Sequence, residues 1–533
     1  KPVFFLNRDN WKASCFNVLD KNEVIFSTLE KLWLEIHSNW QETTQKNILS
    51  WKKNKNIFDN FDDGKSNERL IDFLNFLYIN LNNGYEKKKA IEVSVGKYKE
   101  KWGNDLVYKI NKSQDEIDFK NDLVDVYTNR TEMLYQRTPE TAGWLQAGRP
   151  RREVTTLAYL IITRAELLEV IKSVLKLMEA LLEFCEGHRS TLVPDYTYLQ
   201  RAHPTTLAHY MLTFIQHMAR DLDRMQSVYK RTNKSPACAG STNGSRLPID
   251  RELVAELLGF KGLVVHTRDA MWQSDGPIEL ISSTLAILCN IDRLAEDLQI
   301  WATSEFNFID LSESHSRLSV IMPQKKNPYS LAYIRGVARE MIGRLSGTAA
   351  LQLTPSGQVD NRIFTYGMVP RGLVQTKEAL KLFSATISSL KVNKDKMRLA
   401  ALDSLVGSTD LAEEIMMRYG INAQAAHSIV GQAIRFSIQE GKSIKADLIN
   451  DAAMDIINCS LDISDGHISQ IMDPESIIET RTGPGGASSK SVNKMIADLR
   501  NKINDSNHWR TLEKSWLKRS EKSLVERAKS ICQ

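Results

Sequence analysis

Hydrophobic residues recur at spacings of three and four through the middle of the chain. Residues 157–186 carry this pattern, and intervening apolar residues widen the stripe. This spacing places the side chains on one face of a helix, and a wide stripe indicates a helix that is buried on more than one side. The pattern therefore predicts a long helix in the middle of a bundle. Its apolar positions are Leu157, Leu160, Ile161, Leu168, Ile171, Leu175, Met178 and Leu182.

Two further segments predict long helices. Residues 277–302 repeat the pattern, and Pro277 suits the first turn of a helix. A third helix is expected to start at Pro328 and to run towards Leu351. No run of alternating apolar and polar residues with hairpin turns competes with these segments. The predicted fold class is mainly α, with a long central helical bundle.

The periodicity changes on both sides of this region. Residues 1–115 are rich in Lys, Asn, Ile and Phe, and we interpret their charged runs as solvated loops and helix faces rather than a basic docking patch. Residues 391–396 break the periodicity, and shorter helices are expected to follow. A glycine-rich turn at 482–486 precedes the last helical stretch. We predict three domains, which are an N-terminal helical domain (1–150), a central helix bundle with a polar loop (151–395) and a C-terminal helical domain (396–533).

Composition narrows the class of protein. The chain has 533 residues, of which 42% are hydrophobic and 25% charged, as in soluble globular proteins of two or three domains. A net charge of +5 gives little support for a nucleic-acid partner. The six scattered cysteines include no CxxC pair, so we expect reduced thiols and no metal site. Because no membrane span or signal peptide is visible, we expect a cytoplasmic protein with no membrane partner.

The run from Ser319 to Pro328 reads Ser-Val-Ile-Met-Pro-Gln-Lys-Lys-Asn-Pro. It carries a hydroxyl, an ammonium and a carboxamide into a predicted helix start, where unpaired N–H groups favour an anion. Elimination of an amine from a succinyl group needs such groups, because removing the proton beside a carboxylate creates a dianion. Lys325 and Asn327 are the predicted carboxylate clamp. Ser319 is the predicted base, which requires a closing loop that strips water from its alkoxide.

The string Met-Pro-Gln-Lys-Lys-Asn-Pro resembles the signature loop of the aspartase/fumarase superfamily, in particular its argininosuccinate lyase branch. Residues 194–204 resemble the second signature, which implies that Thr197 and Gln200 bind substrate. Residues 141–152 resemble the first signature, in which an Arg-Asn pair grips the succinyl carboxylates, and Arg151 matches the arginine. The similarity covers roughly residues 120–500.

The resemblance implies a homotetramer with a twenty-helix core, in which each active site is built from three chains. It also implies a small-molecule substrate, either fumarate or an N-succinyl amino compound. No cofactor or metal is expected, because the clamped carboxylate is itself the electron sink.

Several positions depart from the family pattern. Tyr198 stands where the family usually has a histidine, and Ala332 stands where argininosuccinate lyases have its glutamate partner. The pair is therefore replaced as a unit, and Tyr198 is either a proton donor or a packed tyrosine. Arg152 replaces the asparagine of the Arg-Asn pair and adds a charge to the predicted substrate site. Val320 replaces a serine of the signature loop.

Residues 354–362 replace the stretch that holds the arginine half of argininosuccinate in the family. We therefore predict a different amine. The leading hypothesis is a carbon–nitrogen lyase that reversibly eliminates an amine from a succinyl group, with fumarate as product or co-substrate. Two alternatives stay open, namely a non-catalytic binding or structural homologue with a degenerate site and a lyase with a non-amine leaving group such as nitrite.

Overall fold

The computed structural model describes residues 5–6, 25–26, 125–357, 362–402, 405–441 and 443–531. These residues are mainly helical, which confirms the predicted fold class. Two compact units are present, Lys1–Gly143 and Trp144–Gln533. The division into three domains stays a prediction.

In the first unit, β1 (Phe5–Leu6) pairs in parallel with β2 (Ile25–Phe26), and two helices follow, α5 (Val126–Arg137) and α6 (Pro139–Ala142). The side chain of Asp125 caps α5 by accepting the N–H of Thr128 at 2.8 Å. The unit boundary falls within the 3-10 helix η2 (Gly143–Gln146).

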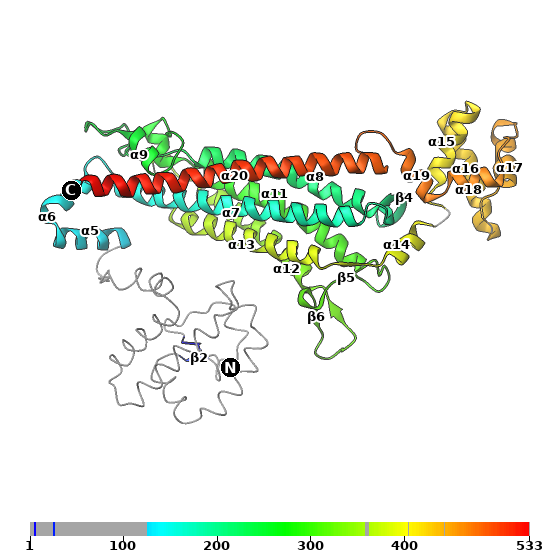
Figure 1. The fold of residues 1–533 in the computed structure, drawn as a ribbon, viewed down its shortest axis with the longest axis horizontal. Helices are drawn as coiled ribbons and strands as arrows, with labels where there is room; N and C mark the ends of the chain where they lie inside the picture. Colours follow the sequence, from blue (N-terminus) through cyan, green and yellow to red (C-terminus); the bar gives the residue numbers. More distant parts are fainter. Residues whose placement is uncertain are drawn as a thin grey trace, which may run out of the picture. The chain divides into compact units, whose positions relative to one another are not determined.

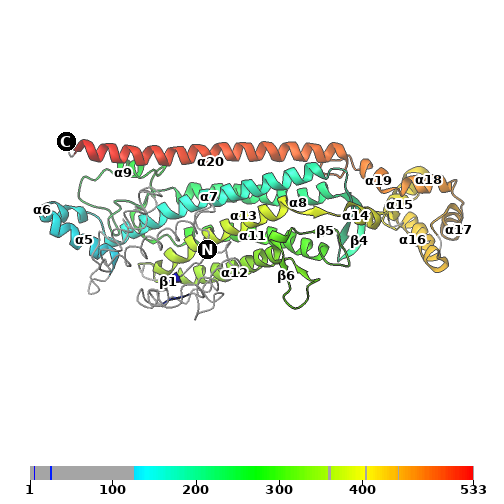
Figure 2. The same cartoon turned by 60° about the horizontal axis from the view of Figure 1, so that its bottom comes forward.

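Long helices form the centre of the second unit (Figures 1 and 2). The three long helices that the sequence predicted are confirmed. They are α7 (Arg151–Gly187), α11 (Asp275–Trp301) and α12 (Tyr329–Leu351), and Pro328 is the N-cap of α12. They pack with α8 (Leu207–Thr232) and α13 (Arg362–Ser388), and α20 (Ser489–Ile531) lies against α7 and α8.

The apolar face of α7 is buried as broadly as its wide stripe predicts. Leu167, Leu168, Ile171 and Leu175 are buried in one core with residues of α8, α11, α12 and α13. The helix therefore has neighbours on most of its sides, and burial of this many aliphatic side chains is the main stabilising contribution to the bundle.

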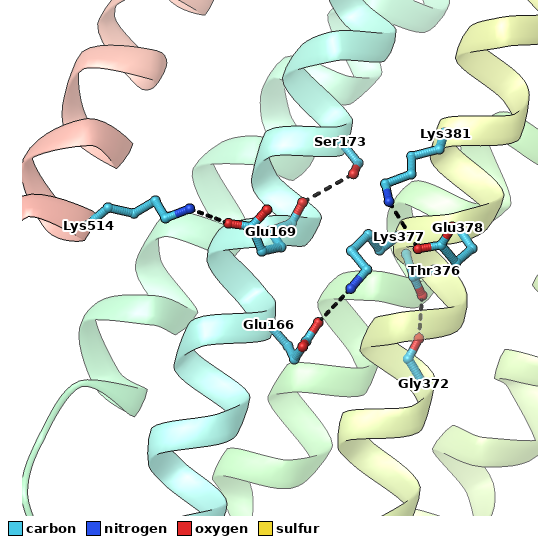
Figure 3. Close-up of polar contacts among 9 residues, drawn as sticks. All are labelled: Glu166, Glu169, Ser173, Gly372, Thr376, Lys377, Glu378, Lys381 and Lys514. Carbon is cyan, nitrogen blue, oxygen red and sulfur yellow. Dashed lines mark hydrogen bonds and ion pairs between the residues drawn. The ribbon is translucent and has the colours of Figure 1, made fainter. Parts of the chain in front are cut away.

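Ion pairs join α7 to helices on two of its sides (Figure 3). Lys377 of α13 pairs with Glu166 at 3.0 Å, and Lys514 of α20 pairs with Glu169 at 2.6 Å. All four side chains are partly exposed, so each pair contributes about 1 kcal/mol or less. Their positions instead show which turns of the three helices face each other.

Shorter helices follow the bundle, as the sequence predicted. They are α14 (Lys394–Ala401), α15 (Ser408–Tyr419), α16 (Ala423–Glu440), α17 (Ala446–Ile457), α18 (Asp465–Ile471) and α19 (Pro474–Thr480). Residues of α15 to α18 form a second hydrophobic core of their own. The predicted glycine-rich turn precedes α20, whose Val492, Ile496, Leu499 and Ile503 then join the core of the bundle.

The strands of the second unit are short antiparallel pairs. A hairpin of β3 (Leu192–Thr197) and β4 (Gln200–Thr206) follows α7, and the hydrophobic pattern did not predict it. The other pairs are β5 (Ile309–Asp310) with β8 (Lys391–Val392) and β6 (Arg317–Leu318) with β7 (Lys326–Asn327). The remaining helices are α9 (Arg251–Leu257), α10 (Thr267–Trp272) and the 3-10 helix η3 (Glu313–His315). Within the described ranges, no helix is long and apolar enough to cross a membrane.

Candidate active site

The loop around Ser319 is a compact turn closed by its own backbone. The N–H of Ser319 donates to the carbonyl of Lys325 at 3.1 Å, and the N–H of Lys325 donates to the carbonyl of Met322 at 3.0 Å. The N–H of Met322 in turn donates to Oγ of Ser319 at 3.1 Å. A donor on this oxygen stabilises negative charge there, so the turn favours the alkoxide form that a serine base requires.

The two lysines of the loop have different surroundings. Lys326 lies in β7 and pairs with Asp310 at 2.7 Å, while Lys325 is exposed. The amide Nδ2 of Asn327 donates to the carbonyl of Arg317 at 3.1 Å, across the β6–β7 pair. Lys326 and Asn327 thus attach the end of the loop to neighbouring residues, whereas the ammonium group of Lys325 is exposed to solvent.

A histidine in the segment before this loop contacts helix α13. His315 lies four residues before Ser319, and its Nδ1 is 3.3 Å from Oγ1 of Thr386 on α13. Burial lowers the pKa of His315, which favours the neutral ring. The histidine therefore attaches the segment before Ser319 to the bundle.

The second signature forms the tip of the β3–β4 hairpin. Thr197 and Gln200 face each other across the tip, and the two residues between them have positive φ angles, 52° at Tyr198 and 58° at Leu199. Two such residues are typical of a type I′ hairpin turn, which glycine and asparagine usually occupy. The Tyr198 side chain is 99% exposed, so in a single chain it does not pack. Strained residues of this kind are frequent at functional sites.

The predicted arginines lie at the other end of the bundle. Arg151 and Arg152 begin α7, with Pro150 as its N-cap. Because α7 has 37 residues, it is about 55 Å long. The hairpin with Thr197 follows the opposite end of this helix. Arg151 and Thr197 of one chain are therefore too far apart to hold the same small molecule.

The Ser319 loop lies towards the end of the bundle that holds the hairpin. Helix α13 runs parallel to α7, since Thr156 bonds with Tyr366 and, further along both helices, Glu166 pairs with Lys377. Helix α12 runs antiparallel to α13, as hydrogen bonds between its last turns and the first turns of α13 show. The start of α12, which follows the loop, is thus at the far end from Arg151.

A cavity of about 830 Å³ lies between the hairpin and the helices α14 and α15. Gln200 is the predicted site residue that lines it, beside Arg201, His203 and Lys396. Ser319, Lys325 and Asn327 lie outside it. Among the described residues, the structure of one chain therefore brings the predicted site residues together in two groups at opposite ends of the bundle, and not in one pocket.

One buried acid near the first signature was not singled out from the sequence. Glu153 lies in the first turn of α7 and is fully buried, with the backbone of Cys238 and Ala239 beside its carboxylate. Burial raises the pKa of Glu153, although the nearby Cys238 backbone and the charges of Arg149 and Arg251 lower it. Its position two residues after Arg151 was the available signal, because acids are frequent in first turns.

The hydrogen bond from Met322 to Ser319 was also missed. Its signal is the spacing of three residues, since a serine oxygen often accepts the N–H of a residue that follows closely in a turn. Among the residues that the structure describes, no three His, Cys, Asp or Glu side chains are grouped so that they could hold a metal ion.

The chain is similar in sequence to known lyases. A family model described as "Lyase" matches residues 75–343. The argininosuccinate lyase of Oceanobacillus iheyensis is 32% identical over 387 residues, which cover 72% of this chain and 82% of that protein. The argininosuccinate lyase of Methanothrix thermoacetophila is 30% identical over 395 residues, which cover 73% of this chain and 80% of that protein.

Solved structures show the same relationship. An EDDS lyase in complex with formate has a TM-score of 0.73 and 27% identity, and the match covers 80% of this chain and 84% of that one. The same EDDS lyase, as a variant, has also been solved with bound fumarate. A fumarate lyase from Mesorhizobium has a TM-score of 0.57 at 16% identity, covering 69% of this chain and 81% of that chain, which supports the fold alone.

Proposed function

Because this chain belongs to the lyase family and is an enzyme of the carbon–nitrogen lyase kind that acts on succinyl-type substrates, we propose that it reversibly eliminates an amine from an N-succinyl compound to release fumarate. The observation that carries the proposal is the turn around Ser319, in which a backbone N–H donates to the oxygen of the proposed base at 3.1 Å. Fumarate bound to an EDDS lyase variant of similar fold supports the same substrate class.

In the proposed reaction, the Ser319 alkoxide takes the proton from the carbon beside a carboxylate. The electron pair of that C–H bond moves onto the carboxylate, which becomes a dianion held by Lys325 and Asn327. The pair then returns to form the carbon–carbon double bond as the C–N bond breaks. The departing nitrogen takes a proton from an acid, and we assign that role to Tyr198.

We further propose that each site is assembled from several chains of a homotetramer. The distance along α7 supports this, because Arg151 and Arg152 lie at one end of the bundle and Thr197 and Gln200 at the other. When the bundles of two chains pack antiparallel across a two-fold axis, the end that holds Arg151 in one chain lies beside the end that holds Thr197 in the other. Arg151, Arg152, Thr197 and Gln200 then hold the succinyl portion between chains.

The amine is proposed to differ from arginine, on the evidence of residues 354–362. A mass-spectrometric screen of purified protein tests the function. Fumarate is mixed with a panel of amines and amino acids, succinyl adducts are sought, and fumarate release from N-succinyl amino acids is assayed in parallel.

Ser319→Ala is the critical variant in this screen, and Ser314→Ala is its matched control, because Ser314 is an exposed serine of the same segment. Loss of a general base is expected to slow turnover by about 10²–10⁴-fold without disturbing assembly. Adducts that form equally well with Ser319→Ala would refute the assigned base. A folded wild-type protein that is silent across the panel would refute the amine as leaving group.

A further inference from the structure

A second cavity lies inside the bundle, at the end where α7 begins. It has a volume of about 420 Å³ and is enclosed by residues of α7, α8, α11 and α13. This volume is in the range of pockets that bind small molecules. Ser319, Lys325, Tyr198 and the other residues of the proposed catalytic site do not line it.

Of two buried polar side chains in this cavity, one lacks a hydrogen-bond partner and the other lacks a counter-charge in the described chain. Tyr159 is 6% exposed, and its hydroxyl has no hydrogen-bond partner in the described chain. Arg362 is 8% exposed, and its guanidinium donates to the carbonyl of Met271 at 2.7 Å and to the carbonyl of Gln273. Within the described ranges, no carboxylate lies within ion-pair distance of Arg362. Buried groups in this state are costly unless a ligand satisfies them.

The charges around the cavity favour an anion. Four cationic side chains line it, of which Arg231 is held in an ion pair by Glu279. Among the lining residues, this leaves Lys230, Lys234 and Arg362 against the carboxylate of Asp275. The ammonium of Lys234 donates to the carbonyl of Lys261 at 2.8 Å, and Asp269 lies near Arg362 outside the lining. A guanidinium has five N–H donors, so Arg362 retains donors beyond those used by the two carbonyls.

Much of the remaining wall is apolar, although Thr156, Thr232, Gln273 and Thr365 also line it. Leu160, Leu263, Val264, Ala270, Pro277 and Leu280 line it. An inorganic anion such as phosphate leaves this surface without a partner, whereas a carboxylic acid with a hydrocarbon body covers it. The ring of Tyr159 stacks on that of Tyr366 with centroids 4.9 Å apart, which fixes the direction of the Tyr159 hydroxyl.

We propose that this cavity is a binding site for a small monocarboxylic acid with an apolar body, whose carboxylate is held by Tyr159 and Arg362. Within one chain, the site is separate from the proposed carboxylate clamp at Lys325, which does not line it. It adjoins the first turn of α7, because Oγ1 of Thr156 bonds both to the hydroxyl of Tyr366 at 3.0 Å and to the carbonyl of Arg152 at 2.9 Å.

Isothermal titration of the full chain with 3-phenylpropanoate tests the proposal, with 3-phenylpropanamide as the uncharged ligand of the same shape. We expect saturable binding of the acid at one site per chain, at least about tenfold tighter than the amide, because a hydrogen bond to a charged group is lost in the amide. Tyr159→Phe is expected to weaken binding of the acid by about tenfold.

Two controls make the result specific. Tyr229→Phe removes the hydroxyl of another buried tyrosine, which lies beside Glu513 and does not line the cavity, and it should bind the acid as the wild type does. Lys325→Met should bind the acid as the wild type does, because Lys325 does not line the cavity. If the acid bound at the proposed catalytic clamp instead, Lys325→Met would weaken its binding. Tyr159→Phe should fold, since its hydroxyl has no hydrogen bond to lose in the described chain, and thermal unfolding of both tyrosine variants checks that they are folded.

The proposal is overturned if the wild type shows no saturable binding at millimolar concentrations of the acid. It is also overturned if Tyr159→Phe binds as tightly as Tyr229→Phe, or if Lys325→Met abolishes binding. None of these outcomes depends on turnover, so the binding site and the lyase reaction are tested independently.

Discussion

The backbone N–H of Met322 donates to Oγ of Ser319 at 3.1 Å. The bond arises within a turn of four residues. A serine hydroxyl is a weak base in water, and a donor already aimed at its oxygen lowers the cost of forming the alkoxide. The signature loop thus supplies, from its own backbone, a hydrogen bond to the oxygen of the proposed base.

The two adjacent lysines of the loop should respond differently to substitution. Lys325→Met is expected to lower kcat/KM by about 10²–10³-fold, because it removes the charge that holds the dianion. Lys326→Met should change kcat/KM little. It should lower stability by about 1 kcal/mol or less, because it removes only the partly exposed ion pair with Asp310. Steady-state kinetics on both variants checks this, and equal losses in kcat/KM would contradict the assignment of Lys325.

The exposed hydroxyl of Tyr198 is expected to act on the leaving amine. Tyr198→Phe should lower turnover by about 10²-fold or more, since general acid catalysis is lost while the hairpin is kept. Tyr196→Phe is the control from the same hairpin, and its half-buried ring packs on Phe306. Comparable rates for Tyr198→Phe and the wild type would exclude Tyr198 as the proton donor.

Mixed oligomers test whether sites are shared between chains. Arg151→Met and Ser319→Ala are each expected to be inactive, but their co-expression should restore up to about one quarter of wild-type activity when the two groups come from different chains. A site contained in one chain would stay inactive, because every chain carries one defect. The measurement is turnover by the purified mixture, with each variant alone as its control.

Glu153 should make stability depend on pH. Its folded pKa is raised by burial above the ordinary value of 4.5, so the folded state binds a proton more readily than the unfolded state. The wild type is then expected to lose stability as pH rises from 4.5 through the folded pKa. Glu153→Gln should have a higher unfolding temperature than the wild type at pH 8, and the gap should narrow towards pH 4.5. A gap independent of pH would contradict the raised pKa.

Local patterns predicted the helices that have regular stripes and clear starts. Helices α7 and α11 follow from their apolar spacing, and α12 follows from Pro328, whose fixed φ suits a helix entrance. Helix α13 was not predicted, and it contains Pro370, a residue that normally interrupts a helix. Neighbouring helices pack against α13 on several sides and hold it together despite the missing N–H.

The β3–β4 hairpin shows the limit of such patterns. Its strands contain Pro194 and Pro204, and its turn has Tyr198 and Leu199 in the left-handed region, where neither residue is favoured. The strands β3 and β4 contact α14 and α19, which are helices far from them in the sequence. No local signal encodes them.

The sequence by itself determined the family and the helical class, and it placed a hydroxyl, an ammonium and a carboxamide in the Ser319 loop, because each depends on residues that are close together along the chain. Only the tertiary structure decided that α20 returns to the bundle, that Arg151 lies at the opposite end from Thr197, and that Tyr159 and Arg362 share a cavity. These relationships join segments separated by tens to hundreds of residues. They are set by the packing of whole helices, which the local pattern does not specify.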